Sequence, residues 1–185
     1  MLIRVGLDQW IAVSGTNPNS TSRGHLVGLN TAGLSGCVAI GLAWDDVISL
    51  AHVYSDCTEA TWLANGNGPG YMQTLTAAFH ATSALRPQAR PSGVLVYSEG
   101  TPRWLPRQLG DWLAEAHGVD PEEGMSPTCR IWVEDERLHW SNQLAENPAD
   151  NNRYTTSANA ATPILAYQAL SPAAAAASPP HGEGD

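Results

Sequence analysis

Hydrophobic residues in the first part of the chain follow the alternation and the short apolar runs that are typical of β-strands. Residues 2–13 alternate loosely and predict a first strand, and residues 25–30 predict a short second strand. Two richer apolar runs, at residues 37–43 and 47–54, surround a short acidic turn and predict a β-hairpin. The first part of the chain is therefore expected to form a sheet.

The second part of the chain adds helical periodicity to further strand patterns. Apolar residues recur at helical spacing over residues 71–85 and 103–117, so each stretch predicts an amphipathic helix. Strand patterns cover residues 94–97, 129–133 and 137–141, and residues 160–170 fit either a helix or a strand. The order of strands, helix, strand, helix and strands predicts a mixed α/β domain.

Length and composition indicate how this domain is bounded. The chain has 185 residues, and 43% of them are hydrophobic, which is typical of one globular domain. We expect residues 1–170 to form that single domain. Residues 171–185 contain five consecutive alanines with prolines and glycines, a composition that predicts a poorly ordered tail.

The charge balance narrows the classes of partner. Eighteen acidic residues against nine basic ones give a formal net charge of −9. Nucleic acids and anionic membranes attract cationic surfaces, so this balance predicts neither nucleic-acid binding nor membrane binding. No stretch approaches the roughly 18 apolar residues of a transmembrane helix, and the first eight residues lack the apolar core of a secretory signal.

Cysteine and histidine spacing argues against disulfides and metals. The three cysteines, Cys37, Cys57 and Cys129, are odd in number and form no C-x-x-C pair, which predicts at least one free thiol. We expect Cys57 and Cys129 to be core thiols. The remaining histidines show no metal-ligand spacing, so no metal and no cofactor are expected. These histidines are His25, His80, His117, His139 and His181.

The predicted hairpin brings a thiol and an imidazole together. With Trp44 and Asp45 as a two-residue loop, Cys37 would lie directly opposite His52, on the same face of the hairpin. An imidazolium at that position would stabilise the thiolate, which is the nucleophilic form of cysteine. A register shift of one residue would place the two side chains on opposite faces.

Residues just before Cys37 add further groups of catalytic interest. Gly33 and Gly36 permit a tight turn, which would bring amide groups close to a bound carbonyl. Ser35 and Gly36 are therefore predicted to bind substrate or to form an oxyanion hole. Thr31, at the end of the preceding strand, is placed to hydrogen-bond the imidazole or the substrate. The structural alternative is a buried cysteine beside a histidine that is satisfied within the core.

The Leu-Ser-Gly-Cys motif at residues 34–37 resembles the signature of cysteine-dependent glutamine deamidase toxins. These toxins are the cytotoxic necrotizing factors and the Burkholderia lethal factor. The motif is also similar to that of the chemotaxis receptor deamidase CheD, in which Gly and Ser have the opposite order. A Thr before the Cys, in the CheD and lethal-factor branches, and a His after it fall here on Thr31, Cys37 and His52. The resemblance covers about residues 25–55.

The resemblance implies a function as well as a fold. It implies a mixed α/β fold whose β-sandwich-like mixed sheets are flanked by two or three helices, with residues 1–170 as a single catalytic domain. It also implies a bacterial toxin or effector that deamidates a glutamine of a host protein. Cys37 would form a thioester, His52 would move the protons, and Thr31 would orient His52 or the substrate. Capture of the thioester by an amine would give a transglutaminase side activity.

Several alternatives stay open on the sequence. We expect a monomer that reaches the host cell by a signal-peptide-independent route, but a CheD-like deamidase of the bacterium's own receptors would remain in the bacterial cytoplasm. A non-catalytic acidic module that binds a basic protein is the alternative from another functional class. Ser35 in an incomplete nucleophile elbow and a papain-like protease are weaker enzymatic alternatives.

Overall fold

The structure is a computed structural model that describes residues 2–16, 27–54, 59, 62, 68–143 and 164–171. The strands are β1 (Leu2–Arg4), β2 (Gln9–Ser14), β3 (Gly28–Ala32), β4 (Val38–Trp44), β5 (Val47–Val53), β6 (Ser92–Tyr97), β7 (Glu122–Met125), β8 (Thr128–Glu134), β9 (Arg137–Ser141) and β10 (Ile164–Ala169). The helices are α2 (Gly68–Ser83) and α3 (Trp104–Asp111), and α3 continues into the π-helical segment η1 (Trp112–Ala116).

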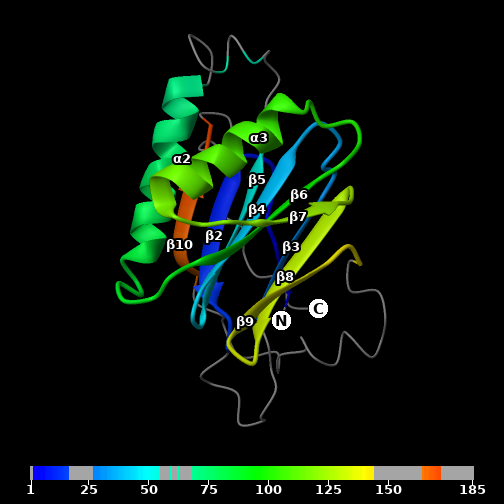
Figure 1. Ribbon diagram of the computed structural model, residues 1–185. Helices are drawn as coiled ribbons and strands as arrows, with labels where there is room; N and C mark the ends of the chain where they lie inside the picture. The colour runs from blue at the N-terminus through cyan, green and yellow to red at the C-terminus, as the bar shows by residue number, and fades with distance from the viewer. Residues whose placement is uncertain are drawn as a thin grey trace.

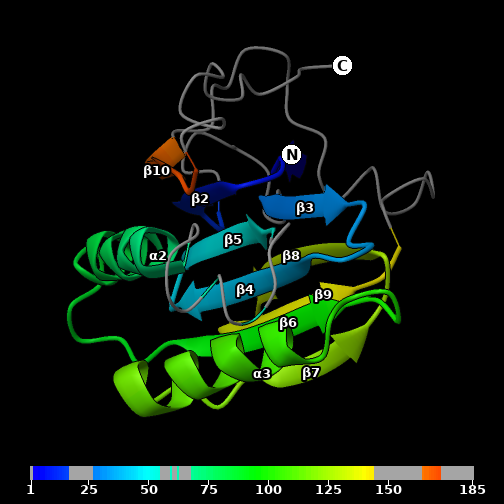
Figure 2. The ribbon, with the colours of Figure 1, turned by 90° about the horizontal axis from the view of Figure 1, so that it is seen from above.

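The strands form two mixed sheets that pack face to face. The large sheet has the order β10-β2-β5-β4-β6-β7, and the small sheet has the order β1-β3-β8-β9. The pairs β1–β3 and β6–β7 are parallel, and the other pairs are antiparallel. Helices α2 and α3 cover the face of the large sheet that points away from the small sheet (Figures 1 and 2). This arrangement confirms the predicted mixed α/β fold with sandwiched sheets and flanking helices.

Burial of the large sheet on both faces explains the apolar runs of its central strands. Every residue of β4 and β5 is buried. On one face Ile40 and Leu42 pack in a core with Leu75 of α2 and Leu105 of α3. The opposite face belongs to a second core, in which the large sheet packs against Ile131 and other residues of the small sheet. A strand that is covered on both sides gains from apolar residues at every position, so continuous runs replace alternation.

The structure refines several predicted elements. The strand predicted at residues 2–13 is two strands, β1 and β2, which lie in different sheets. A turn separates them at Asp8, where φ is 55°, a left-handed conformation that ends a strand. The ambiguous residues 160–170 contain strand β10, and the short, mostly exposed strand β7 has no apolar pattern that could have predicted it. Residues 25 and 26 lie outside the described residues, so the second strand is seen from Gly28.

Other predicted elements are confirmed. The hairpins of β4 with β5 and of β8 with β9 form, and the acidic turn between β8 and β9 is exposed at Asp135 and Glu136. The predicted helical stripe of α3 and η1 is buried at Leu105, Leu109 and Leu113, although its last member, Ala116, is exposed. The aromatic side chains of Trp104 and Trp112 pack against the helix-side core, as expected. All of the tail beyond Ser171 lies outside the described residues.

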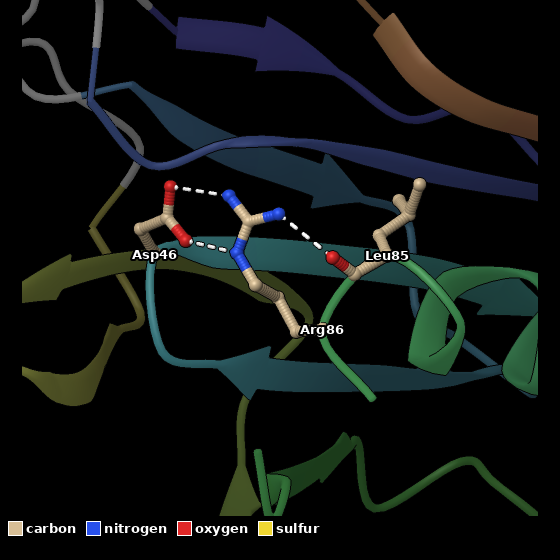
Figure 3. Close-up of polar contacts among 3 residues, drawn as sticks. All are labelled: Asp46, Leu85 and Arg86. Carbon is tan, nitrogen blue, oxygen red and sulfur yellow. Dashed lines mark hydrogen bonds and ion pairs between the residues drawn. The ribbon is translucent and has the colours of Figure 1, made fainter. Parts of the chain in front are cut away.

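An ion pair ties the β4–β5 turn to the turn that follows α2 (Figure 3). Arg86 Nε and a terminal guanidinium nitrogen donate to the two carboxylate oxygens of Asp46, at 2.6 and 2.8 Å. The other terminal nitrogen donates to the Leu85 carbonyl at 2.7 Å. This bidentate geometry lowers the pKa of Asp46, mainly through the hydrogen bond, and holds the hairpin loop against the helix.

Among the described residues, no helix is long and apolar enough to cross a membrane.

Candidate active site

The register of the β4–β5 hairpin decides how Cys37 and His52 are related. Trp44 pairs with Val47, and Ala39 pairs with His52, so the loop consists of Asp45 and Asp46. The prediction that Cys37 lies directly opposite His52 is therefore wrong. Trp44 is fully buried in the helix-side core, which keeps it in the strand. Asp45 takes the left-handed conformation, with φ of 51°, which Asp tolerates in a turn better than Trp does.

The register nevertheless keeps Cys37 and His52 on the same face of the hairpin. The observed pairing differs from the predicted one by two residues, and side chains alternate between faces with a period of two. Cys37 lies two residues before Ala39, the direct partner of His52, so the two side chains are diagonal neighbours. Such neighbours are about 7–8 Å apart between Cα atoms, within reach of a longer side chain. The face that they share points toward the small sheet, where Cys37 belongs to the inter-sheet core.

Thr31 connects His52 to the small sheet. Its hydroxyl lies 2.8 Å from His52 Nδ1, and it donates a hydrogen bond to the Val5 carbonyl, also at 2.8 Å. A hydroxyl has one proton, so Thr31 must accept the hydrogen bond from His52 Nδ1–H. The neutral imidazole therefore carries its proton on Nδ1, and Nε2 has a free lone pair. The predicted hydrogen bond between Thr31 and the imidazole is confirmed.

The second ring nitrogen of His52, Nε2, is buried and has no hydrogen-bond partner among the described residues. Burial lowers the pKa of His52 to about 4, against the opposing effect of the Asp8 charge. Burial and then the charge of Asp8 raise the pKa of Cys37 to about 11. At neutral pH the resting pair is thus a neutral thiol and a neutral imidazole, and the expectation of an imidazolium-stabilised thiolate is wrong because burial disfavours both charges.

A tight turn presents Cys37. The Cys37 amide donates to the Leu34 carbonyl at 3.2 Å, and Gly36, at the third position of this turn, has a φ of 94°. Only glycine adopts such a φ without strain, which is the pattern of a type II turn. The amides of Ser35 and Gly36 have no acceptor among the described residues, so both donors are available to a bound carbonyl oxygen.

The loop between β6 and α3 clamps this turn in place. Ser98 Oγ donates to the Leu34 carbonyl at 2.9 Å. The single hydroxyl proton of Thr101 is shared between the carbonyls of Cys37, at 2.9 Å, and Leu34, at 3.2 Å. Thr101 is buried. No sequence pattern distinguishes this clamp, because hydroxyl residues before a helix are also common as ordinary capping residues.

Asp8 and Tyr71 were also missed, and both lie at the site. The Asp8 amide donates to the His52 carbonyl at 2.8 Å, and the Tyr71 hydroxyl donates to Asp8 Oδ1 at 2.5 Å. Burial, followed by the charge of Asp8, raises the pKa of Tyr71 far above its usual range, and Cys37 contributes to the same shift. The lone acidic residue between two apolar segments was the signal that could have identified Asp8.

These groups meet at one end of the large sheet. Cys37 lies where β4 begins, His52 lies near the end of β5, and the Ser98–Thr101 clamp follows the end of β6. Helices α2 and α3 begin at the same end, which is the upper end in Figure 1, opposite the β4–β5 turn. The chain therefore brings these groups to one end of the sandwich from six separate segments: the β1–β2 turn, β3, the β4 start, β5, the start of α2 and the loop after β6.

Other cysteine and histidine side chains that the structure describes pack against neighbouring side chains. Cys129 is fully buried opposite Thr31 in the β3–β8 pair, and burial raises its pKa to about 12, so its predicted role as a core thiol is confirmed. His117 stacks on Phe79 with ring centroids 3.8 Å apart. Cys57, His25 and His181 lie outside the described residues. Within the described part of the chain, no three His, Cys, Asp or Glu side chains gather as metal ligands.

A separate pocket lies between α3 and β7. It has a volume of about 600 Å³, and charges of both signs line it, including Arg103, Arg107 and Glu123. The Tyr97 hydroxyl at its rim donates to Glu123 at 2.6 Å. Neither Cys37 nor His52 lines this pocket, and its lining includes no Cys, Ser, Thr or Lys, so the candidate active site is placed at the end of the sheet.

Comparison with known proteins adds no relative to this picture. A scan against protein-family models found no match for the sequence, and a search of curated proteins found no matching sequence. The geometry around Cys37 and the resemblance of its motif therefore carry the functional argument.

Proposed function

We propose that this protein is a cysteine-dependent hydrolase that deamidates a glutamine side chain of a target protein. The single observation that carries the proposal is the set formed by Thr31, His52 and Cys37. The hydrogen bond from Nδ1–H to Thr31 leaves the lone pair of His52 on Nε2, in a buried position diagonal to the Cys37 thiol. A nucleophile, a base of the correct tautomer and a group that orients the base are the parts of a triad for acyl transfer.

The first half of the reaction follows from the neutral resting pair. As Cys37 Sγ attacks the carbonyl carbon of the glutamine side chain, the thiol proton moves to His52 Nε2. The free amides of Ser35 and Gly36 donate hydrogen bonds to the carbonyl oxygen as it becomes negatively charged. The imidazolium then protonates the amide nitrogen, the carbon–nitrogen bond breaks, and ammonia leaves behind a thioester on Cys37 and a neutral His52.

The second half regenerates the enzyme. Neutral His52 takes a proton from a water molecule that attacks the thioester carbon. When the carbon–sulfur bond breaks, the proton returns from His52 to Cys37, and the product is a glutamate side chain. A primary amine in place of water would give an amide-linked adduct and a transglutaminase side activity. The reaction needs no cofactor, because water is the only co-reactant.

The resemblance of the motif supports a particular biological role. We infer that the protein is a bacterial toxin or effector that acts on a host protein, because the motif and the positions of Thr31, Cys37 and His52 are similar to those of the deamidase toxins. A CheD-like deamidase of the bacterium's own receptors uses the same chemistry on another target. The net charge of −9 favours a target with a basic surface around its glutamine.

Mass spectrometry of treated lysates tests the proposal. The full chain is incubated with a host-cell lysate and, in parallel, with bacterial membranes, and peptides are searched for conversion of glutamine to glutamate. Conversion should disappear with Cys37→Ala and with His52→Ala, and it should persist with Cys129→Ala, which removes the other described thiol. Added methylamine separates hydrolysis from transglutamination. Conversion that persists in Cys37→Ala would overturn the mechanism, and the absence of any Cys37-dependent conversion would favour the non-catalytic module.

A further inference from the structure

Asp8 is held beside the catalytic pair by its own backbone. It lies in the turn between β1 and β2 with a φ of 55°, and it is 9% exposed. Its amide donates to the His52 carbonyl at 2.8 Å, and its carbonyl accepts from the Leu170 amide at 2.7 Å. Two backbone contacts, one to β5 and one to the residue just after β10, therefore fix the turn that carries Asp8.

One carboxylate oxygen of Asp8 is occupied and the other is free. Oδ1 accepts the hydrogen bond of the Tyr71 hydroxyl at 2.5 Å. Tyr71 is 2% exposed, its oxygen also accepts from the Tyr54 amide at 3.3 Å, and its ring packs on Trp62 with centroids 5.0 Å apart. Among the described residues, Oδ2 of Asp8 has no hydrogen-bond partner. The fixed Oδ1 leaves Oδ2 available to a donor from a ligand.

The charge of this carboxylate reaches the reacting groups without a compensating cation. Asp8 raises the pKa values of both Cys37 and His52, and within the described chain no Arg contributes to either shift. Asp8 also forms no ion pair with any described residue. A buried carboxylate without a cation is costly, and an Asn at this position could accept the Tyr71 hydrogen bond equally well. A carboxylate here therefore offers something beyond the hydrogen bond to Tyr71, namely a negative charge close to Cys37 and His52.

We propose that the free oxygen of Asp8 makes the site selective for a carboxamide over a carboxylate, an inference that rests on the proposed deamidase function. The NH₂ of a glutamine side chain has two hydrogens to donate, and a carboxylate acceptor matches one of them. The glutamate product has no such donor and carries a like charge, so Asp8 repels it. Asp8 thus helps to bind the substrate and to expel the product from the same position.

Alkylation of Cys37 tests this selectivity without a known substrate. Iodoacetamide is a carboxamide and iodoacetate is the matching carboxylate, and both alkylate sulfur with loss of iodide and of the thiol proton. The rate constant for iodoacetamide at Cys37, divided by that for iodoacetate, is measured by peptide mass spectrometry in the wild type and in Asp8→Asn. We expect the ratio to fall at least about tenfold in Asp8→Asn. Asp45→Asn removes the same charge at the far end of the β4–β5 hairpin and should leave the ratio unchanged.

A second measurement uses only the wild-type protein, in case Asp8→Asn fails to fold. The two reagents are the cationic aminoethyl methanethiosulfonate and the anionic sulfonatoethyl methanethiosulfonate. The ratio of the cationic to the anionic rate constant should be at least about tenfold larger for Cys37 than for glutathione. Equal ratios in wild type and Asp8→Asn, or no preference for the cation, overturn the inference.

The outcomes separate this inference from the proposed function. Loss of deamidation in Cys37→Ala together with an unchanged alkylation ratio in Asp8→Asn leaves the deamidase standing and removes the role of Asp8. The expected charge selectivity without any Cys37-dependent deamidation removes the proposed reaction instead. A Cys37 that no reagent modifies in the folded protein contradicts both.

Discussion

The hydroxyl of Thr31 lies 2.8 Å from Nδ1 of His52, across the interface between the two sheets. Because Thr31 donates its own proton to the Val5 carbonyl, this contact determines which nitrogen of the imidazole is protonated. A side chain of the small sheet thereby prepares a base that belongs to the large sheet. The tautomer of His52 therefore depends on how the two sheets pack.

Replacement of Thr31 by Val removes the acceptor of this bond and keeps the shape of the side chain. We expect kcat for deamidation of the glutamine peptide found in lysates to fall about 100-fold, since general base catalysis contributes at least that much. Nitrogen-15 chemical shifts of His52 should show loss of the single Nδ1–H tautomer. Thr31→Ser retains the hydroxyl and should retain both activity and tautomer. A Thr31→Val variant with an unchanged tautomer would contradict this assignment.

The low pKa of His52 predicts a loss of stability in acid. Between its ordinary value of 6.5 and the folded value of about 4, the unfolded chain binds a proton that the folded protein does not bind. The contribution of His52 to the free energy of unfolding should therefore be constant above pH 6.5. It should fall by about 3 kcal/mol as the pH decreases from 6.5 toward 4. Urea unfolding at several pH values should show a smaller loss for His52→Gln. Identical pH profiles for the two proteins would refute the prediction.

Gly36 is required by the conformation of the nucleophile turn. At its φ of 94°, an added Cβ meets no neighbouring atom within 4 Å, so the cost of Gly36→Ala is in the backbone and amounts to about 1–2 kcal/mol. Deamidation should fall as well, because the amides of Ser35 and Gly36 would move. Gly70→Ala in α2 is the matched control: its Cβ also meets nothing, and the substitution should be neutral or stabilising. Thermal unfolding and activity of the pair provide the comparison.

The ion pair of Arg86 with Asp46 should matter little for activity. Its side chains are 39% and 42% exposed, and it lies at the end of the hairpin opposite Cys37. We expect Arg86→Gln to lower the free energy of unfolding by no more than about 1 kcal/mol, with the difference shrinking at high salt. Arg86→Lys keeps the charge but loses the bidentate geometry, so its free energy of unfolding should lie between those of the wild type and Arg86→Gln. A large loss of deamidation in Arg86→Gln would show that this turn communicates with the site.

The β4–β5 hairpin is predicted by its sequence in all but the position of its loop. The apolar runs around the acidic turn correctly predicted β4 and β5, because a strand pattern is a local property of consecutive residues. The predicted loop, Trp44 and Asp45, begins one residue before the observed loop, Asp45 and Asp46. The sequence pattern permits both positions, and only the burial of Trp44 in the core assigns this residue to the strand. The same-face relation of Cys37 and His52 survived because the register error was an even number of residues.

By itself, the sequence determined the strand and helix periodicities, the mixed α/β class and the motif at residues 34–37, together with the candidates Thr31, Cys37 and His52. These depend on the spacing of neighbouring residues, which the chain carries before it folds. Only the tertiary structure decided that Thr31 reaches His52, that Ser98 and Thr101 hold the turn, and that Asp8 and Tyr71 enter the site. Burial of the thiol and imidazole, which makes the resting pair neutral, was likewise decided there. Hydrogen bonds between distant segments and the desolvation of charge arise only when packed layers exclude water.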